Sequence, residues 1–298
     1  MGNTADILTI IKENYSDLSK GHKKIADFVL SKYDKAAYLN ASALAAEVGI
    51  SESTVVRFAY ELGCDGFSAF QRSLQEVIPN KLTSVQRMDV TTSRMGDKDI
   101  LTTVMNTDLE KIRQTLEDTD RNEFTGAVDT ILGAKRVYIL GVRSAASLAQ
   151  FVYFYTTLLL PNVKLLQTSS SSEIFEQLIR TDENSVVLAI SFPRYSKRTL
   201  KAVQFASSRG SKIITIADSP YAPINEYATH KLIARSDMAS FVDSLVAPLS
   251  LINSLIVAIG MHKKNEVKKT FEELERIWDE YEVYEKPEGK DHEPEKEN

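Results

Sequence analysis

The first eighty residues place their apolar side chains three or four positions apart. This spacing puts the side chains on one face of a helix and is typical of short amphipathic helices. The positions that follow it are Ile7, Ile10, Ile11, Leu18, Ile25, Phe28, Val29, Leu44, Val48, Val55, Val56, Phe58 and Leu62. The pattern predicts an all-α domain over residues 1–79.

Hydrophobicity then falls in the stretch NKLTSVQRMDVTTSRMGDKD, which is rich in Thr, Ser, Arg and Asp and follows a proline. This composition predicts a linker over residues 80–98. Helical spacing returns beyond it, and we expect one helix over Asp99–Glu117 and another over Thr119–Leu132.

After Gly133 the pattern changes to short runs of Val, Ile and Leu that alternate with helical stretches. The runs are Arg136–Gly141, Val163–Gln167, Ser185–Ser191, Lys212–Ala217 and His230–Arg235, and the main helical stretches are Ala145–Leu160, Ser172–Arg180 and Tyr195–Arg209. Apolar strands separated by crossovers of helical length are typical of a parallel sheet with both faces covered. We therefore predict an α/β domain over residues 99–280, with a flavodoxin-like parallel five-stranded sheet and helices on both faces.

A long apolar helix, expected over Phe241–Met261, closes the series. Its apolar side chains include Leu245, Leu249, Ile252, Leu255, Ile256 and Ile259. They suit either an interface between subunits or a helix that is buried within one subunit. The final stretch YEKPEGKDHEPEKEN holds six acidic residues against three lysines, which predicts a disordered acidic tail over residues 281–298.

Length and composition limit the classes of protein to consider. A chain of 298 residues suggests two domains. The single cysteine excludes an intrachain disulfide, and the chain opens with no charged-then-apolar leader, so we expect a cytoplasmic protein. The apolar runs are too short to span a bilayer, so no membrane partner is expected. A net charge of −5 gives no overall attraction for nucleic acid, so a polyanion has to be bound by a local patch.

Residues 42–71 have the pattern of a helix-turn-helix. Ser42 is suited to cap a first helix that carries Leu44, and Gly49 stands where a helix end favours a left-handed residue. Ile50 can then fill the core between the helices, and Ser51 is placed to cap the second helix. The turn between the two helices is therefore three or four residues long.

The second helix is expected to bury Val55, Val56 and Ala59 and to expose its polar residues. The candidates for contacts with DNA are Ser51, Ser53, Thr54 and Arg57, together with Lys23, which is expected to lie in a basic patch with Lys20, His22 and Lys24. The N-terminal end of such a helix enters the major groove, where Ser and Thr reach phosphates or base edges and Arg can fork onto guanine. An αα-hairpin that serves only for packing is the alternative.

The charge of the N-terminal region bears on the oligomeric state. Residues 1–80 contain eight Lys or Arg and ten Asp or Glu, a net charge of −2, whereas DNA-binding domains usually have a basic excess. One subunit would therefore make few phosphate contacts. We expect a homodimer or homotetramer, which multiplies these contacts.

Hydroxyl side chains cluster after three of the predicted strands. The candidates for ligand binding are Ser144 after the first strand, Ser169 and Ser170 after the second, and Ser191, Ser196 and Thr199 after the third. In an open parallel sheet the ligand lies beyond the carboxyl ends of the strands, where the strand order reverses. Hydroxyls and helix N-termini, aided by a cation such as Arg143 or Arg194, are suited to a phosphate group. The sequence therefore predicts a site for a small phosphorylated molecule.

Catalytic and metal-binding chemistry is sparse in the sequence. The four histidines are not paired in sequence with an acid, and metal-ligand spacings are absent. Neither a G-x-x-x-x-G-K nor a G-x-G-x-x-G motif occurs, which argues against nucleoside triphosphates and dinucleotides. We expect no catalytic residue, no metal and no cofactor.

With these two groups of residues, the chain resembles the RpiR/MurR family of bacterial transcriptional regulators. The resemblance rests mainly on LSKGHKKIADFVLSKYDKAAYLNASALAAEVGISESTVVRFAYELGCDGFSAFQ and LAISFPRYSKRTLKAVQFASSRGSKIITIADS, and covers about Ile7–Ile78 and Gly126–Met261. It implies an N-terminal domain that binds double-stranded operator DNA and a C-terminal sugar isomerase (SIS) domain that senses a phosphosugar instead of converting it.

Transferred to this sequence, the resemblance implies phosphosugar contacts from Ser144, Ser191, Ser196 and Thr199, and DNA contacts from Ser53, Thr54 and Arg57. Two positions depart from the pattern of many SIS domains. Arg143 replaces a small residue, and Ser191-Phe-Pro-Arg replaces Ser-x-Ser-Gly. Both changes shrink the pocket or alter its charge.

These inferences give one main hypothesis and two alternatives. The main hypothesis is a regulator in which a phosphorylated sugar changes the spacing of two recognition helices and thereby operator binding. A sugar-phosphate isomerase would use the same pocket with a positioned acid and base. An oligomeric sugar-phosphate-binding protein without a role at DNA is the other alternative.

Overall fold

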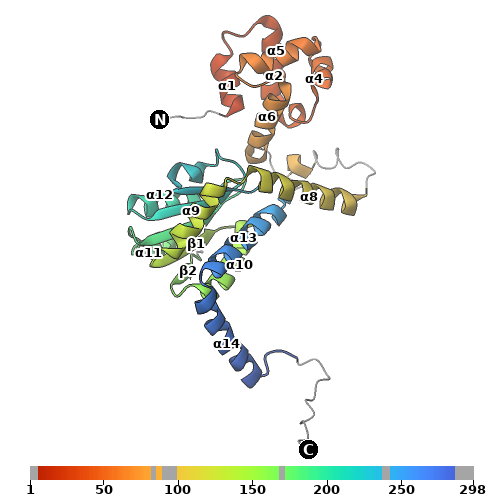
Figure 1. The fold of residues 1–298 in the computed structure, drawn as a ribbon. Helices are drawn as coiled ribbons and strands as arrows, with labels where there is room; N and C mark the ends of the chain where they lie inside the picture. Colours follow the sequence, from red (N-terminus) through yellow and green to blue (C-terminus); the bar gives the residue numbers. More distant parts are fainter. Residues whose placement is uncertain (1–5, 82–84, 89–98, 168–171, 237–241, 286–298) are drawn as a thin grey trace, which may run out of the picture.

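The structure, a computed structural model, describes residues 6–81, 85–88, 99–167, 172–236 and 242–285. It consists of a helical N-terminal domain followed by an α/β domain (Figure 1). The fold class predicted from the sequence is therefore confirmed. Of the tail predicted over residues 281–298, residues 286–298 lie outside the described part of the chain.

The N-terminal domain packs its helices around one apolar core. The helices are α1 (Ile7–Asn14), α2 (Lys20–Ser31), α3 (Tyr33–Ala36), α4 (Ala41–Val48), α5 (Glu52–Glu61) and α6 (Phe67–Lys81). Ile11, Ile25, Leu44 and Phe58 from four of these helices are each fully buried in that core. The apolar spacing of the sequence therefore corresponds to the buried faces of these helices.

Two helices lead from the N-terminal domain to the sheet, α8 (Ile100–Asp118) and α9 (Arg121–Leu132). Each begins one or two residues later than the sequence predicts. Asp99 and Asp120 act as N-caps, because each carboxylate accepts hydrogen bonds from two backbone amides of the following turn. Within the predicted linker, residues 85–88 are helical, while residues 82–84 and 89–98 lie outside the described residues.

The sheet contains five parallel strands in the order β2-β1-β3-β4-β5. Their bounds are β1 (Arg136–Gly141), β2 (Val163–Leu165), β3 (Ser185–Ile190), β4 (Lys212–Ala217) and β5 (His230–Ile233). This is the flavodoxin-like order, as predicted. The strands β2 and β5 are each two residues shorter than predicted. Both are edge strands with a single neighbour, so fewer backbone hydrogen bonds define their ends.

Helices cover both faces of the sheet (Figure 1). They are α10 (Ala145–Leu159), α11 (Glu173–Leu178), α12 (Lys197–Ser208), the 3-10 helix η1 (Pro223–Tyr227) and α13 (Val246–His262). Ile139 and Leu188 face a core shared with α9, α10 and α13, whereas Leu140 and Ala189 face α11, α12 and η1. Successive strand residues are therefore buried on opposite faces, which explains their continuous apolar character.

The helix α13 begins at Val246 and not at the predicted Phe241, which lies outside the described residues. Its side chains Ile252, Leu255 and Ile259 are buried against the sheet and α10 within the same chain. For these side chains the structure bears out a helix that is buried within one subunit. They are therefore not available to an interface with another copy.

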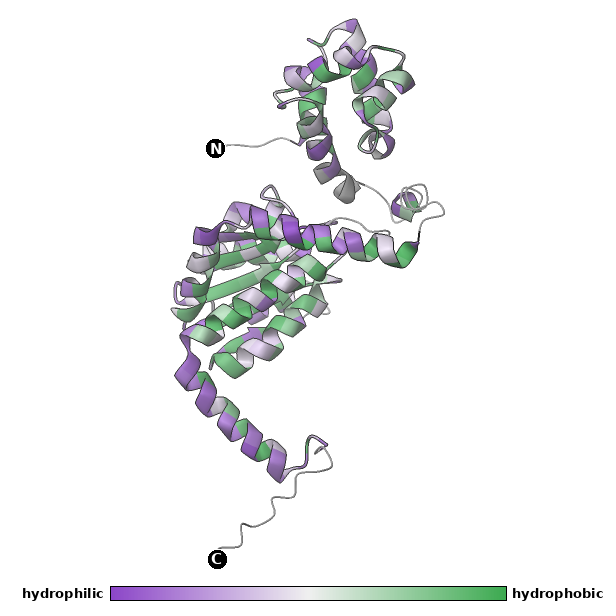
Figure 2. Ribbon diagram, turned by 45° about the vertical axis from the view of Figure 1, so that its right-hand side comes forward, coloured by the Kyte–Doolittle hydropathy of each residue, from purple (hydrophilic) through white to green (hydrophobic). Residues whose placement is uncertain are grey.

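A further helix, α14 (Lys264–Glu280), follows α13, and the sequence pattern did not separate it from the rest of the domain. None of its side chains is buried, and it extends away from the sheet (Figure 1). Hydrophobic and hydrophilic residues alternate along it (Figure 2). Among the described residues, no single helix is long and apolar enough to cross a membrane. The helices α13 and α14 would be long and apolar enough when taken together, but a bend of 98° separates them.

Candidate functional sites

The first candidate site is the helix-turn-helix formed by α4 and α5. Gly49 ends α4 with φ of 70° in the left-handed region, as the sequence predicts. The N-cap of α4 is Asn40 and not the predicted Ser42, because the Asn40 side-chain oxygen accepts a hydrogen bond from the amide of Ala43 at 2.8 Å. Asn40 is one residue before the helix, where its side chain reaches the third amide, whereas Ser42 lies inside the first turn.

Four of the predicted DNA-binding residues form one connected group at the N-terminus of α5. The Ser51 hydroxyl lies 3.0 Å from that of Ser53 and 2.8 Å from that of Thr54. Arg57 donates from Nε to the Ser53 carbonyl oxygen at 3.3 Å. Ser51, Ser53 and Arg57 are exposed, and Thr54 is partly exposed. The group therefore presents hydroxyls and one guanidinium to solvent.

The buried face of α5 differs in one position from the prediction. Val55 and Ala59 are buried as expected, but Phe58 is the third buried residue, and Val56 is only partly buried. The ring of Phe58 also packs edge-on against His22 at 5.6 Å between ring centroids. Because His22 is buried there, it does not belong to the exposed basic patch that the sequence predicted around Lys23.

The helix α2, which carries Lys23, lies beside the recognition helix. A Cβ atom at Gly21 would come within 3.5 Å of the Thr54 methyl group. The Lys23 ammonium donates to the Ser16 carbonyl oxygen at 3.0 Å and stacks over the Tyr15 ring. Lys23 is thus held on a helix that adjoins the exposed group of α5.

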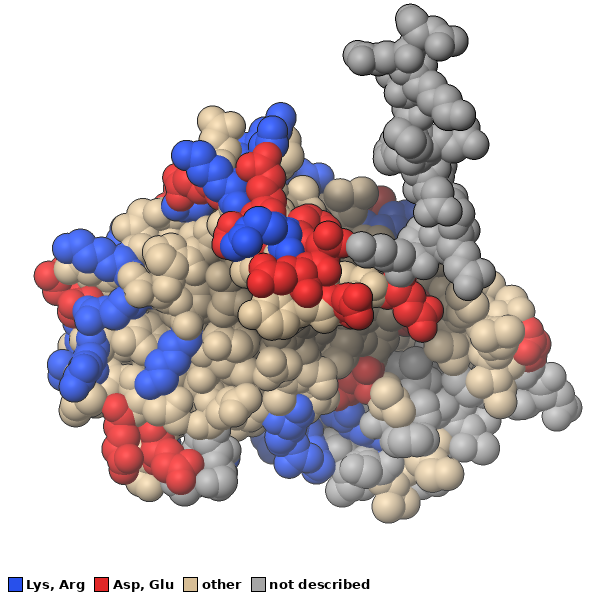
Figure 3. Space-filling view, turned by 90° about the horizontal axis from the view of Figure 1, so that it is seen from below, with Lys and Arg blue, Asp and Glu red and all other residues tan. Residues whose placement is uncertain are grey.

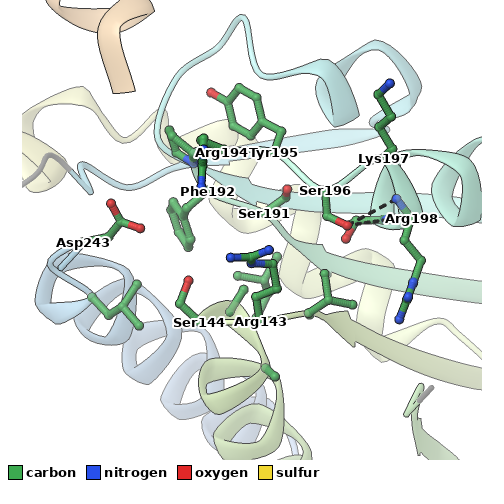
Figure 4. Close-up of a pocket in the computed structure, with 18 of the residues that line it drawn as sticks. Arg143, Ser144, Ser191, Phe192, Arg194, Tyr195, Ser196, Lys197, Arg198 and Asp243 are labelled. Atoms are coloured by element: carbon green, nitrogen blue, oxygen red, sulfur yellow. Dashed lines mark hydrogen bonds between the residues drawn. The ribbon is translucent and has the colours of Figure 1, made fainter. Parts of the chain in front are cut away.

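The second candidate site is a cavity of about 1060 Å³ at the carboxyl ends of β1 and β3 (Figure 4). The neighbouring strands β1 and β3 lie where the strand order reverses, which is the position that the sequence predicted for a ligand. The predicted residues that line it are Arg143, Ser144, Ser191, Ser196 and Thr199. Ser169 and Ser170 lie outside the described residues.

The hydroxyls of the cavity differ in how they are bonded. The Ser196 hydroxyl caps α12 by accepting hydrogen bonds from the amides of Arg198 at 3.2 Å and Thr199 at 3.4 Å. Ser144 precedes α10 and makes no side-chain capping bond. The Thr199 hydroxyl is buried and has no hydrogen-bond partner among the described residues. The N-termini of α10 and α12 both open onto the cavity, so their backbone amides add positive potential.

Five cationic side chains line the cavity, Arg87, Arg143, Arg194, Lys197 and Arg198, against a single carboxylate among the described lining residues. On the face of the molecule seen from below, by contrast, Lys and Arg lie among Asp and Glu with broad uncharged areas between them (Figure 3). The cavity therefore concentrates charge of one sign. Such a cavity favours an anion.

That single carboxylate belongs to Asp243, and it pairs with Arg87. Arg87 Nη1 donates to Asp243 Oδ1 at 2.7 Å, and both side chains are largely buried. Burial raises the pKa of Asp243, although the charges of Arg87 and Arg194 act in the opposite direction. Neither Arg87 nor Asp243 stands out in the sequence, because Arg87 lies in a polar linker and Asp243 has no motif around it.

In the part of the chain that the structure describes, groups for metal or acid-base chemistry do not gather in either site. Within the described residues, no three His, Cys, Asp or Glu side chains are grouped to hold a metal ion. His230 does contact an acid, since its Nδ1 lies 3.2 Å from Glu123 Oε2. It is the first residue of β5, however, so it lies at the amino ends of the parallel strands, whereas the cavity lies at the carboxyl ends of β1 and β3. The described lining of the cavity thus combines cations and hydroxyls with one paired carboxylate.

Comparison with known families gives two matches along the chain. Residues 5–81 match a helix-turn-helix domain of the rpiR family, and residues 130–258 match the SIS domain. Together the two matches include the helix-turn-helix and every described lining residue of the cavity except Arg87.

Relatives with similar sequences are named as regulators of transcription. An uncharacterized HTH-type transcriptional regulator of Clostridium perfringens is 26% identical over 250 residues, which cover 81% of this chain and 87% of the relative. HexR of Escherichia coli, an HTH-type transcriptional regulator, is 27% identical over 228 residues, covering 73% of this chain and 74% of HexR.

Among solved structures, NanR of Vibrio vulnificus in complex with ManNAc-6P is similar with a TM-score of 0.57 and 19% identity, over 91% of this chain and 97% of NanR. The sugar isomerase domain of an RpiR transcription factor from Sphaerobacter thermophilus gives a TM-score of 0.55 and 24% identity, over 58% of this chain and 96% of that domain. Both similarities concern the fold.

Proposed function

Because the chain belongs to the rpiR family of helix-turn-helix transcriptional regulators and carries a SIS domain behind its DNA-binding domain, we propose that it is a cytoplasmic regulator whose SIS domain senses a phosphorylated sugar. Binding of the sugar changes the affinity of the helix-turn-helix domain for its operator. The observation that carries this proposal is the cavity at the end of β1 and β3, where hydroxyls and cations surround two helix N-termini.

The chemistry of the cavity suits a phosphate ester. A phosphate carries about two negative charges and three strong acceptor oxygens, which match the hydroxyl donors of Ser144, Ser191 and Thr199 and the amides of the helix N-termini. Arginine side chains add charge-assisted hydrogen bonds. The volume of about 1060 Å³ leaves room for a sugar beyond the phosphate. NanR, which shares the fold, was solved with ManNAc-6P, and this also supports the proposal.

The exposed group on α5 suits the major groove of operator DNA. Arg57 is the base-reading residue in this proposal, because its planar fork can donate to both acceptors of a guanine. Ser51, Ser53 and Thr54 contact phosphates or base edges, and Lys23 contributes a phosphate contact from α2. The observation in favour is that Ser51, which precedes α5, and the three α5 residues are connected by hydrogen bonds on one exposed surface.

We propose that the protein is not an enzyme. An isomerase needs an acid and a base placed at the sugar, whereas the single carboxylate in the described lining pairs with Arg87. The alternative of a sugar-phosphate isomerase is tested by incubating the protein with aldose and ketose phosphates. Turnover that Ser191→Ala abolishes would contradict the proposal.

A thermal-shift screen of phosphorylated hexoses, pentoses and amino sugars tests the sensing function. One phosphosugar should raise the melting temperature, whereas the same sugar without its phosphate should not. Ser191→Ala should weaken the effect, because Ser191 is buried at the cavity wall. The selected phosphosugar should then change the affinity for DNA obtained from a random pool. No shift with any phosphosugar would contradict the proposal.

We also propose that the protein acts as a homo-oligomer and that α8 contributes to the interface. Large apolar side chains of α8 are more than half exposed, namely Ile100, Leu101, Met105, Leu109 and Leu116. An exposed apolar stripe on one helix is typical of a contact with another protein surface. A second copy fits this role, because the negative net charge of residues 1–80 requires a second set of DNA contacts.

Sedimentation velocity tests the interface. Substituting Leu101→Asp and Leu109→Asp together should shift the protein toward the monomer, because both side chains would be buried between copies. Val257→Asp, at an equally exposed position of α13, is the matched control. Dissociation by the control variant alone would place the interface on α13 instead.

A further inference from the structure

Arg87 differs from the other cations of the cavity in its origin along the chain. It lies in the helical residues 85–88, between the last helix of the DNA-binding domain and the first helix of the α/β domain. Of the other four cations, Arg143 and Arg194 come from the loops after β1 and β3, and Lys197 and Arg198 come from the first turn of α12. One side chain of the interdomain connection thus reaches the wall of the cavity.

The contact that holds Arg87 in the cavity wall is an ion pair with Asp243. The side chains of Arg87 and Asp243 are 6% and 14% exposed, and Nη1 lies 2.7 Å from Oδ1. Asp243 lies three residues before the start of α13, so the ion pair joins the interdomain connection to the body of the α/β domain. Removal of either partner from such a buried pair leaves the other charge uncompensated.

This ion pair shortens the tether of the DNA-binding domain. The helix α6 ends at Lys81 and α8 begins at Ile100, and a fully extended connection between them could span about 66 Å. Arg87 follows Lys81 by only six positions, a maximum of about 21 Å. Whatever holds Arg87 at the cavity therefore restricts the positions that the DNA-binding domain can reach.

An anion in the cavity competes directly with Asp243 for Arg87. Both the anion and the Asp243 carboxylate are attracted to the guanidinium, and they repel one another. Burial raises the pKa of Asp243, because desolvation disfavours the charged carboxylate. A phosphate dianion offers more acceptor oxygens and more charge than a carboxylate.

Resting on the proposed phosphosugar site, we propose that Arg87 is an effector-binding residue supplied by the interdomain connection, and that the anionic group of the effector replaces Asp243 as its partner. The effector then fixes the short tether more firmly than Asp243 does alone. Occupancy of the cavity is in this way transmitted to the DNA-binding domain through one side chain. Asp243 holds the residue in place while the cavity contains no effector.

Titration calorimetry of the full-length protein with inorganic phosphate tests the proposal. Arg87→Met keeps the aliphatic stem and should weaken phosphate binding about ten-fold or more, because a charge-assisted hydrogen bond is lost. Asp243→Asn should strengthen phosphate binding several-fold, because the competing carboxylate is removed. Arg113→Met, which removes an exposed arginine of α8, is the charge-matched control and should bind as the wild type does.

The two substitutions are expected to change phosphate affinity in opposite directions, and this separates a binding role of the ion pair from a structural one. If Arg87 and Asp243 served only to hold the fold together, both substitutions would weaken binding, and that result would overturn the proposal. Unchanged binding by Arg87→Met, with binding by the wild type intact, would also overturn it and leave the proposed function standing. Absence of binding of both phosphate and every phosphosugar by the wild type would contradict the proposed function itself, and this inference with it.

Hydrogen exchange of the peptides that contain residues 85–88 tests the tether. Phosphate should slow their exchange in the wild type and in Asp243→Asn, with the larger change in Asp243→Asn because the anchor is missing there before phosphate binds. Arg87→Met should exchange rapidly with or without phosphate. Equal slowing in Arg87→Met would refute the role of Arg87 as the link.

Discussion

Gly141 is the last residue of β1, and its replacement by Ala is expected to disturb both the packing of α10 and the cavity. A Cβ atom at Gly141 would lie 2.5 Å from the Ala145 carbonyl oxygen and 2.9 Å from the Ala149 Cβ. The first neighbour is backbone and the second is a methyl group without rotamer freedom, so neither can turn aside. The start of α10 would have to move by about 1 Å to restore ordinary van der Waals contact.

Overpacking of this kind costs about 1–3 kcal/mol of unfolding free energy. Gly141→Ala should therefore unfold at a lower urea concentration, as measured by far-UV circular dichroism. Displacement of the α10 N-terminus should also weaken the binding of phosphate, because the α10 amides lie at the wall of the cavity.

Gly260→Ala is the matched control for this substitution. The nearest atoms to a Cβ there are the methyl groups of Leu159 at 3.7 and 3.8 Å, an ordinary contact. Because Gly260 lies within α13, Ala should stabilise the helix by up to about 1 kcal/mol. Equal urea midpoints for Gly141→Ala, Gly260→Ala and the wild type would refute the steric reasoning.

Three further predictions concern single side chains. Ser196→Ala should destabilise the protein by about 1 kcal/mol in urea unfolding because α12 loses its cap; an unchanged midpoint would show that the cap contributes nothing. Arg57→Ala should weaken binding to selected DNA by about 1–3 kcal/mol and spare random DNA, whereas equal loss on both would make Arg57 a phosphate contact. Hydrogen bonds from Arg136 and Ser185 lower the pKa of Asp182 in the folded protein. The ionised Asp182 side chain therefore stabilises the fold fully above the pKa that an Asp has in the unfolded chain, about 3.9. This stabilisation is lost as the pH falls from there through the lowered pKa of the folded state. The difference in melting temperature between the wild type and Asp182→Asn should accordingly be present at neutral pH and shrink below about pH 4; a difference that does not depend on pH would contradict this assignment.

The sequence by itself determined the fold class of each domain and the position of the cavity beyond β1 and β3. Apolar spacing of three to four residues gave the helical domain, and continuous Val, Ile and Leu runs gave the parallel sheet, because burial on one face or on both leaves a periodic trace. The hydroxyls after β1 and β3 could be assigned to one site because the carboxyl ends of parallel strands share an edge. Ser144, Ser191, Ser196 and Thr199 accordingly line one cavity.

The exact residues at which helices begin depended on local hydrogen bonds that the composition of the sequence does not reveal. The helix α4 begins after Asn40, because the capping bond to Ala43 forms there and not at Ser42. Both Asn and Ser are good N-cap residues, so their backbone geometry decides between them. The helix α14 has its own apolar stripe, but its separation from α13 by a bend of 98° is visible only in three dimensions.

Only the tertiary structure brought Arg87 to the cavity. Arg87 and Asp243 are separated by 156 positions in the sequence, and neither stands in a periodic pattern or a motif. A single long-range ion pair leaves no trace in local composition, because its partners are selected by their distance in the folded chain. Hydrophobic periodicity thus specified the architecture, whereas the pairing of isolated charges followed from how the folded segments meet.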